Sequence, residues 1–188
     1  KHVNIRLLDA LAIAAGQRMP EFLPLNLSSL AWAFAALVYS NEPFIGEISQ
    51  KSMQILGEFS AQQLANTTWA FAWLGFRDQP CLTTFGSRAM ELLSEYSPQG
   101  LSNTAWAYAK LQIEDAPLFD AIAAEAQCKL QHFQAQNLSN LSWSFAAVQF
   151  LTERFMESIA QASLPKMADF DAQALANTAW AYAKISYI

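Results

Sequence analysis

The sequence predicts an all-α fold, an α-solenoid of stacked helix-turn-helix repeats with a 37-residue period. The first observation is a tryptophan column with no insertion: Trp32, Trp69, Trp106, Trp143 and Trp180. An aromatic column keeps the same spacing, at Phe22, Phe59, Tyr96, Phe133 and Phe170, and so do Pro43, Pro80 and Pro117. Each unit of such an array covers its apolar surface with its neighbours, so the columns predict a stack of similar units.

The first helix of each unit is expected around its tryptophan. The expected ranges are 27–39, 63–76, 100–113, 137–150 and 174 to the end. Alanine supplies high helix propensity there, and Ser60, Ser97 and Asp171 are suitable N-caps. Two adjacent apolar faces on such a short helix predict packing on most of its sides.

The second helix of each unit is expected over 43–58, 80–95, 117–132 and 154–168. Capping residues precede these ranges: Asn41, Asp78, Asp115 and Thr152. Pro165 is expected to end or kink the last of these helices early. Residues 5–19 align with a second helix of a preceding unit.

A single repeat domain is therefore expected over residues 1–188. It divides into a half repeat at 5–26, full repeats at 27–63, 64–100, 101–137 and 138–174, and a half repeat at 175–188. We interpret the chain as a fragment of a longer protein, since it begins at Lys1 and its last repeat stops in mid-pattern. Membrane insertion is not expected, because no apolar run reaches the roughly 20 residues of a spanning helix.

Composition excludes several classes of protein. Hydrophobic residues make up 53% and charged residues 14%, which excludes a disordered chain. The net charge of −5 argues against a generally basic, nucleic-acid-coated surface. Cys81 and Cys128 match no metal or redox spacing, and each is expected to be a small buried apolar residue.

No catalytic constellation is visible in the sequence. His2 and His132 are isolated, and Glu91 and Glu95 lie one turn apart on a face expected to be solvated. A phosphate-binding glycine loop and a paired-histidine zinc motif are both missing. We therefore expect a protein that is not an enzyme, with no metal, no cofactor and no small-molecule substrate.

The remaining face of the first helix is the candidate surface for RNA or another partner. It carries amides, tryptophan and cations at repeated positions: Gln62, Asn66, Trp73, Arg77, Gln99, Asn103, Lys110, Gln136, Asn140, Gln173, Asn177 and Lys184. Amide side chains suit base edges because each offers a donor and an acceptor. Helical-repeat proteins read single-stranded RNA with a few such side chains in each unit. The first unit lacks the amides and has Leu25 and Ser29 instead.

Three of these features have a structural alternative. The asparagine column can also form a structural ladder, in which the side chains bond each other or neighbouring backbone, and this role can coexist with base reading. Trp73 can stack on a base or pack against the next unit. The tryptophan column from Trp32 to Trp180 lies between alanines and is expected in the core between repeats.

Charge is expected to divide between two sides of the solenoid. The five first helices contain no Asp or Glu, whereas Lys110, Lys184 and, at an edge, Arg77 are cationic. The acids lie on the second helices. A concave side built from first helices would be neutral to weakly positive, and three cations give only a small counterion-release contribution.

The segments LANTTWAFAWL (64–74) and LSNTAWAYAKL (101–111), together with the period, resemble the heptatricopeptide repeat family and the related octotricopeptide repeats. The resemblance covers about residues 6–188, and the 34-residue tetratricopeptide unit fits less well. It implies an organellar protein, in mitochondria or chloroplasts, concerned with RNA processing, stability, translation or ribosome assembly. The RNA-facing positions of that family match the Gln62, Asn66 and Trp73 columns approximately. Many members of that family carry a C-terminal RAP domain, which residues 1–188 do not include.

Two functions are consistent with these expectations. The favoured one is a non-catalytic module that holds single-stranded RNA along the stripe of first helices. The alternative is a protein-interaction scaffold or structural subunit of a larger organellar complex, which suits an acidic solenoid with few charges.

Overall fold

The computed structural model describes residues 4–150 and 153–186, which form α-helices and short 3-10 turns without a strand. The inner helices are α2 (Pro24–Ala36), α4 (Ala61–Leu74), α6 (Pro98–Lys110), α8 (Ala135–Ala147) and α10 (Ala172–Ser186). The outer helices are α1 (Ile5–Gln17), α3 (Glu42–Gln54), α5 (Gln79–Leu92), α7 (Ala116–Lys129) and α9 (Glu153–Ser163). The predicted all-α fold is confirmed.

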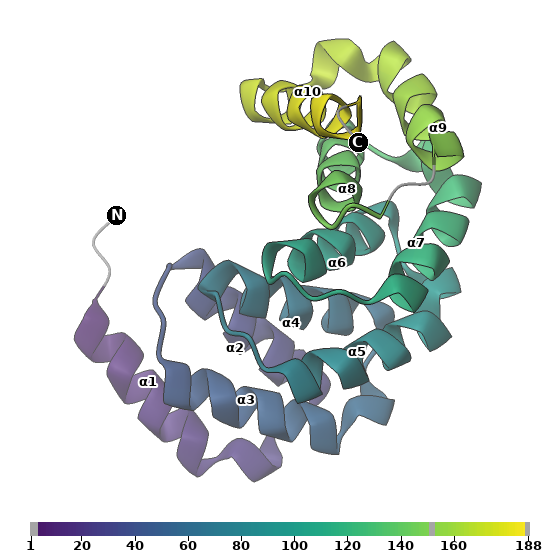
Figure 1. Cartoon of the computed structure of the whole chain (residues 1–188). Helices are drawn as coiled ribbons and strands as arrows, with labels where there is room; N and C mark the ends of the chain where they lie inside the picture. Colours follow the sequence, from purple (N-terminus) through teal and green to yellow (C-terminus); the bar gives the residue numbers. More distant parts are fainter. Residues whose placement is uncertain (1–3, 151–152, 187–188) are drawn as a thin grey trace.

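The helices form two stacked layers that curve into a solenoid (Figure 1). Inner helices of successive repeats contact each other more extensively than outer helices do, which places them on the shorter, concave side of the curve. Figure 1 shows α5, α7 and α9 outside α6, α8 and α10. The tryptophan-bearing helices therefore line the concave side.

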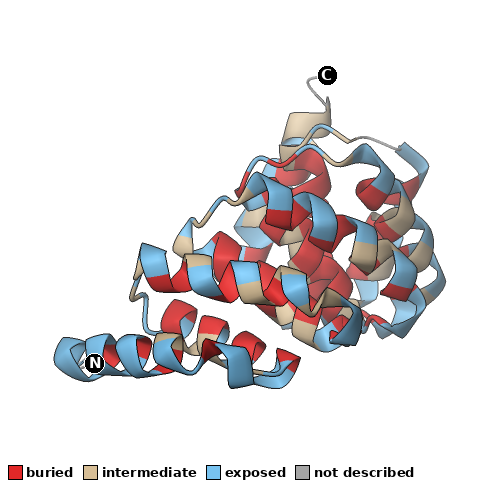
Figure 2. Ribbon diagram, turned by 90° about the horizontal axis from the view of Figure 1, so that it is seen from below, coloured by how far each residue is buried: buried red, intermediate tan, exposed pale blue. Residues whose placement is uncertain are grey.

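The core lies between the two layers, where Figure 2 shows most of the buried residues. Phe34 and Phe145 occupy the same repeat position and are fully buried. Their rings contact outer-helix residues Phe44 and Phe155, with centroids 5.1 and 4.9 Å apart. Burial of apolar surface between the layers, these rings included, stabilises the stack.

Each inner helix begins two or three residues before its predicted start. The caps explain this difference, because they fix the first turn directly after themselves. Ser97 Oγ accepts a hydrogen bond from Gly100 N at 3.1 Å, and Asp171 Oδ1 accepts one from Ala174 N at 2.7 Å. Ser60 acts in the same way, so all three predicted N-caps are confirmed.

The inner helices also end earlier than predicted, because a residue with left-handed backbone stops each of the first four. These residues are Val38, Gly75, Gln112 and Gln149, with φ between 53° and 72°. The amide that follows each of them bonds back to an inner-helix carbonyl, as in the 2.9 Å bond from Phe76 N to Phe71 O. This is a Schellman-type helix end, repeated with the period of the sequence.

The outer helices are capped by Asn41, Asp78 and Asp115, as predicted. Thr152 lies outside the described residues. Each of α3, α5 and α7 ends early and continues as a 3-10 turn, at Leu56–Glu58, Leu93–Glu95 and Leu130–His132. Helix α9 ends at Ser163, directly before the turn Leu164–Asp169 that contains Pro165, so the predicted early end is confirmed.

Basic side chains of the outer layer hold neighbouring repeats together. Lys129 Nζ donates to the carbonyls of Ser94 and Tyr96, at 2.9 and 2.8 Å, in the preceding 3-10 turn. Lys51, Arg88 and Lys166 make equivalent bonds to the turn one repeat earlier. These four cationic side chains therefore bond backbone carbonyls between repeats, a structural role that the sequence pattern did not predict.

Two predictions of burial need correction. The tryptophan column is not core: Trp69, Trp106 and Trp143 are only partly buried, and Trp32 and Trp180 are exposed. Tryptophan is too wide for the close approach of neighbouring inner helices, so its ring lies at the concave surface. Cys81 is buried as predicted, but Cys128 is exposed on α7.

Candidate nucleic-acid interface

The concave surface is formed by one face of the inner helices. No Asp or Glu occurs in the described residues of these helices, which leaves the face neutral apart from its lysines. In α4, α6, α8 and α10 the glutamine column lies in the first turn and is exposed, and the asparagine column follows one turn later and is partly exposed. The small residue after them is buried, as at Ala70 and Ala107, because the next inner helix packs there.

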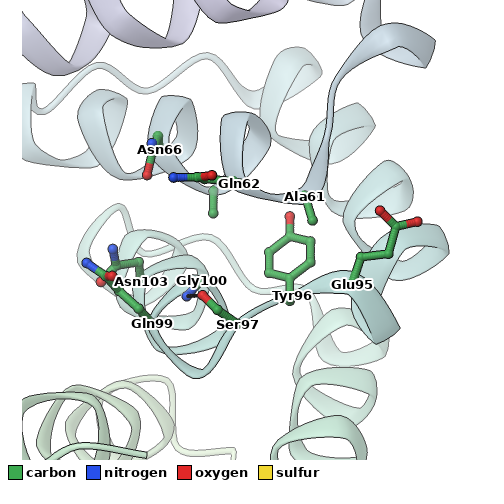
Figure 3. Close-up of a pocket in the computed structure, with 10 residues that line it drawn as sticks. Ala61, Gln62, Asn66, Glu95, Tyr96, Ser97, Gln99, Gly100 and Asn103 are labelled. Carbon is green, nitrogen blue, oxygen red and sulfur yellow. Dashed lines mark hydrogen bonds between the residues drawn. The ribbon is translucent and has the colours of Figure 1, made fainter.

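Four of the predicted amides meet in one hollow between α4 and α6, which we call the amide groove (Figure 3). Gln62 and Asn66 come from α4, and Gln99 and Asn103 come from α6. The groove encloses about 310 Å³, with Tyr96 and Gly100 in its lining and Glu95 at one end. Parallel stacking of two inner helices therefore brings the amides of adjacent repeats to opposite walls.

The predicted asparagine ladder is not formed. Among the described residues, no hydrogen bond links an asparagine of this column to its equivalent in the next repeat. Gln136 and Asn140 instead bond each other within α8, from Nε2 to Oδ1 at 2.9 Å. Gln173 and Asn177 lie on α10 and line none of the concave hollows described here. Among the hollows of the described residues, the α4–α6 groove has glutamine and asparagine of the two columns on both walls.

Tryptophans form a row along the concave side of the inner helices, from mid-helix positions to Trp73 in the last turn of α4. Trp73 stacks on Trp69, with ring centroids 5.3 Å apart, and reaches Trp106 of the next repeat at 5.9 Å. Trp143 and Trp180 are similarly placed, at 6.1 Å. Trp73 remains 47% exposed, so its ring offers surface for stacking even though it also packs on its neighbours.

The structure brings Lys110 and Lys184 to a second hollow, which we call the cationic hollow. It encloses about 550 Å³ around Trp143 and Ala147 of α8, with one lysine on each flanking inner helix. Lys184 Nζ lies 5.0 Å from the Trp180 ring centroid, and Lys110 Nζ lies 6.0 Å from that of Trp106. Glu114 also lines this hollow and reduces its positive charge.

Arg77 is exposed but has a structural contact. Its guanidinium donates to the carbonyl of Gln112 in the next repeat at 3.4 Å. Gln112 is one of the left-handed helix ends described above. Arg77 therefore joins two helix ends at the rim of the concave face, apart from the amide groove.

Several concave residues were missed in the sequence analysis. Trp32 lines a third hollow, of about 550 Å³ between α2 and α4, together with Leu25, Ser29 and Gln62. Trp143 lines the cationic hollow. The 37-residue spacing does not predict that the tryptophan rings are exposed, because buried residues repeat with the same spacing.

The described residues also lack two features of other classes of protein. None of the helices there is long and apolar enough to cross a membrane. The same residues contain no group of His, Cys, Asp and Glu side chains arranged to hold a metal ion.

Comparison with known proteins identifies one family. The profile of the family described as RESC6, RNA-editing substrate-binding complex 6 protein, matches residues 1–188. This match supports a helical family concerned with RNA but does not support the narrower resemblance to heptatricopeptide or octotricopeptide repeats. A comparison with curated proteins gave no match.

Proposed function

Because this chain belongs to the RNA-editing substrate-binding complex 6 family, we propose that it holds single-stranded RNA on its concave face. The carrying observation is the amide groove, with free amides on both walls of a face whose helices lack acidic residues. The tryptophan row and the cationic hollow lie on the same face and offer stacking surface and positive charge.

Single-stranded RNA fits this surface better than a duplex. Amides read base edges, which a duplex hides in its deep major groove, and tryptophan stacks only on bases that are already unstacked. Two lysines supply few phosphate contacts, so the affinity is expected to be modest and sensitive to salt. The role is binding, without catalysis and without a small-molecule substrate.

The family name supports work within a complex that binds RNA-editing substrates. A mitochondrial location is consistent with such a complex, whereas the family match gives no support for a chloroplast. Processing, stability or translation of organellar RNA as the purpose of binding stays a prediction.

A second candidate function, docking of protein subunits, is favoured by the two ends of the solenoid. Leu11 on α1 is 45% exposed, although Ile48, its equivalent one repeat later, is fully buried. At the other end, Leu175 on α10 is 45% exposed and its equivalent Leu138 is fully buried. Apolar faces of this kind suit helical protein partners, and they lie apart from the amide groove.

The test is fluorescence anisotropy with a labelled single-stranded RNA and with the same strand in a duplex. We expect the single strand to bind more tightly than the duplex, and its affinity to fall as the salt concentration rises. A matched pair of variants separates the candidates: Asn66→Ala/Asn103→Ala should weaken RNA binding, and Leu7→Glu/Leu11→Glu should leave it unchanged. Equal binding of strand and duplex, or none at low salt by a folded protein, would overturn the proposal.

A further inference from the structure

We propose that the amide groove between α4 and α6 is a pocket for one nucleobase, which it recognises by its hydrogen-bonding edge. This inference rests on the proposed function. It adds the position along the solenoid at which the protein reads the RNA sequence. The other inner-helix hollows then contribute stacking and charge without base selection.

The chemistry of the lining favours a base over a phosphate. Gln62, Asn66, Gln99 and Asn103 each carry one acceptor oxygen and a donor nitrogen, and no hydrogen bond of the described residues occupies them. A base edge presents neighbouring donors and acceptors, which paired amides can match. The lining contains no cation, and the Glu95 carboxylate at one end repels a phosphate.

Other repeats lack this arrangement. In α8 the amides of Gln136 and Asn140 satisfy each other at 2.9 Å. On the α2 side of α4, Leu25 and Ser29 stand where the amides would be, so that hollow has amides on one wall only. The α4–α6 groove is thus the place where two open amide pairs converge.

The repeat that starts α6 also departs from those that start α2, α4 and α8 at two positions in the groove, whereas α10, with Ala174 as third residue, shares only the first departure. Helices α2, α4 and α8 have Asn26, Gln63 and Asn137 as third residue, and each amide oxygen accepts a bond from the N-cap amide, at 3.0 to 3.2 Å. Helix α6 has Gly100 there and forgoes this capping box. A Cβ at Gly100 would lie 3.1 Å from Tyr96 Cδ1, so glycine provides room for the Tyr96 ring.

Tyr96 is the second departure, because the equivalent residues in the other repeats are all phenylalanine. Its hydroxyl is buried near Thr104 and makes no hydrogen bond of good geometry. The first turn of α6 keeps the Ser97 cap but lacks the reciprocal bond of a capping box, and it buries a hydroxyl that has no hydrogen-bond partner. Such departures concentrate at binding sites, which supports selection for the shape and polarity of the groove.

The experiment measures dissociation constants of the whole chain for single-stranded octamers of A, C and U. The parent is expected to prefer one octamer over the poorest by about tenfold, the typical discrimination of a good bidentate contact. Asn66→Ala/Asn103→Ala should reduce this ratio toward one. The Gln136→Ala/Asn140→Ala control removes the same groups from α8 and should keep the ratio.

Gly100→Asn provides an independent variant that is expected to fold, because Asn26 and Asn137 occupy this position in folded repeats. It displaces the Tyr96 ring slightly and narrows the groove, and the restored capping box offsets this crowding, so thermal stability should change little while the ratio falls. Binding of all three octamers with equal affinity would overturn the pocket and leave the proposed function intact. Unchanged ratios in both groove variants would also overturn it, and no binding of any octamer would overturn both.

Discussion

Trp73 of α4 contacts Trp106 of α6 across the repeat boundary, with ring centroids 5.9 Å apart, while stacking on Trp69 of its own helix. The two alternatives for this residue therefore coexist, because the ring both packs on its neighbours and leaves nearly half its surface exposed. An aromatic surface of this kind on a concave face accepts an unstacked base.

Trp73→Ala is expected to weaken binding of single-stranded RNA by about 1–3 kcal/mol, the usual contribution of one stacked base. Trp73→Phe should keep most of the affinity, since a smaller aromatic face remains. Titration of labelled RNA and thermal unfolding are to be measured on both variants. A loss of stability without loss of affinity would make Trp73 a packing residue only.

Val38 is expected to destabilise the first inner-helix end. It is β-branched and has a φ of 53°, at the position where the next repeat has Gly75 with a φ of 72°. Because its side chain is 75% exposed, little packing is lost on truncation. Val38→Gly should raise the free energy of unfolding by about 1 kcal/mol through relief of strain. Urea denaturation measures this, and Val148→Gly, where φ is −86°, should lower stability instead.

Substitution of Lys129 should affect stability, and substitution of Lys110 should affect RNA binding. Lys129→Met removes a cation that bonds two carbonyls of the preceding repeat, so it is expected to lower the free energy of unfolding by about 1–2 kcal/mol. Lys110→Met removes an exposed cation of the cationic hollow and should weaken RNA binding with little effect on stability. Equal effects of the two variants on both measurements would contradict these roles.

Alkaline pH should destabilise the fold through Cys81. Burial raises the pKa of its thiol from 9.0 to about 12. The thiol of the unfolded chain loses its proton near pH 9, whereas the thiol of the folded chain keeps it. The contribution of Cys81 to the free energy of unfolding is therefore fully present below pH 9 and is lost as the pH rises toward 12. Between these two pKa values the free energy of unfolding falls by about 1.4 kcal/mol per pH unit.

Urea unfolding of the parent and of Cys81→Ala at about pH 8 and about pH 10 checks this, since the difference between the two proteins should shrink by about 1 kcal/mol. The exposed Cys128 supplies the control, because Cys128→Ala should unfold with the parent's pH dependence. A pH dependence shared by all three proteins would rule out Cys81 as the source.

The sequence predicts the scaffold well because its determinants are local and periodic. Capping at Ser97 and Asp115 depends on bonds within three residues, and the tryptophan spacing fixes how repeats align. Helix ends were placed too late because Val38, Gln112 and Gln149 adopt a left-handed backbone that nothing in their chemistry announces. Only Gly75 carried such a signal.

The site was predicted less completely because it depends on contacts between repeats. Gln62 and Asn103 share a groove only through the stacking of α4 on α6. The same column in α8 is closed by a bond between Gln136 and Asn140 that spacing does not reveal. Lys110 and Lys184 lie two repeats apart in sequence, and the curvature of the inner layer brings them to one hollow.

The most direct test of RNA binding by the concave face is the salt dependence of affinity for a labelled single strand, measured on the parent and on Lys110→Ala/Lys184→Ala. If both lysines contact phosphates, the variant binds more weakly and its plot of log K against log salt is shallower by about 1.4, or about 0.7 per lost contact. An unchanged affinity and slope in a folded variant would contradict the account, because the RNA would then lie elsewhere on the protein.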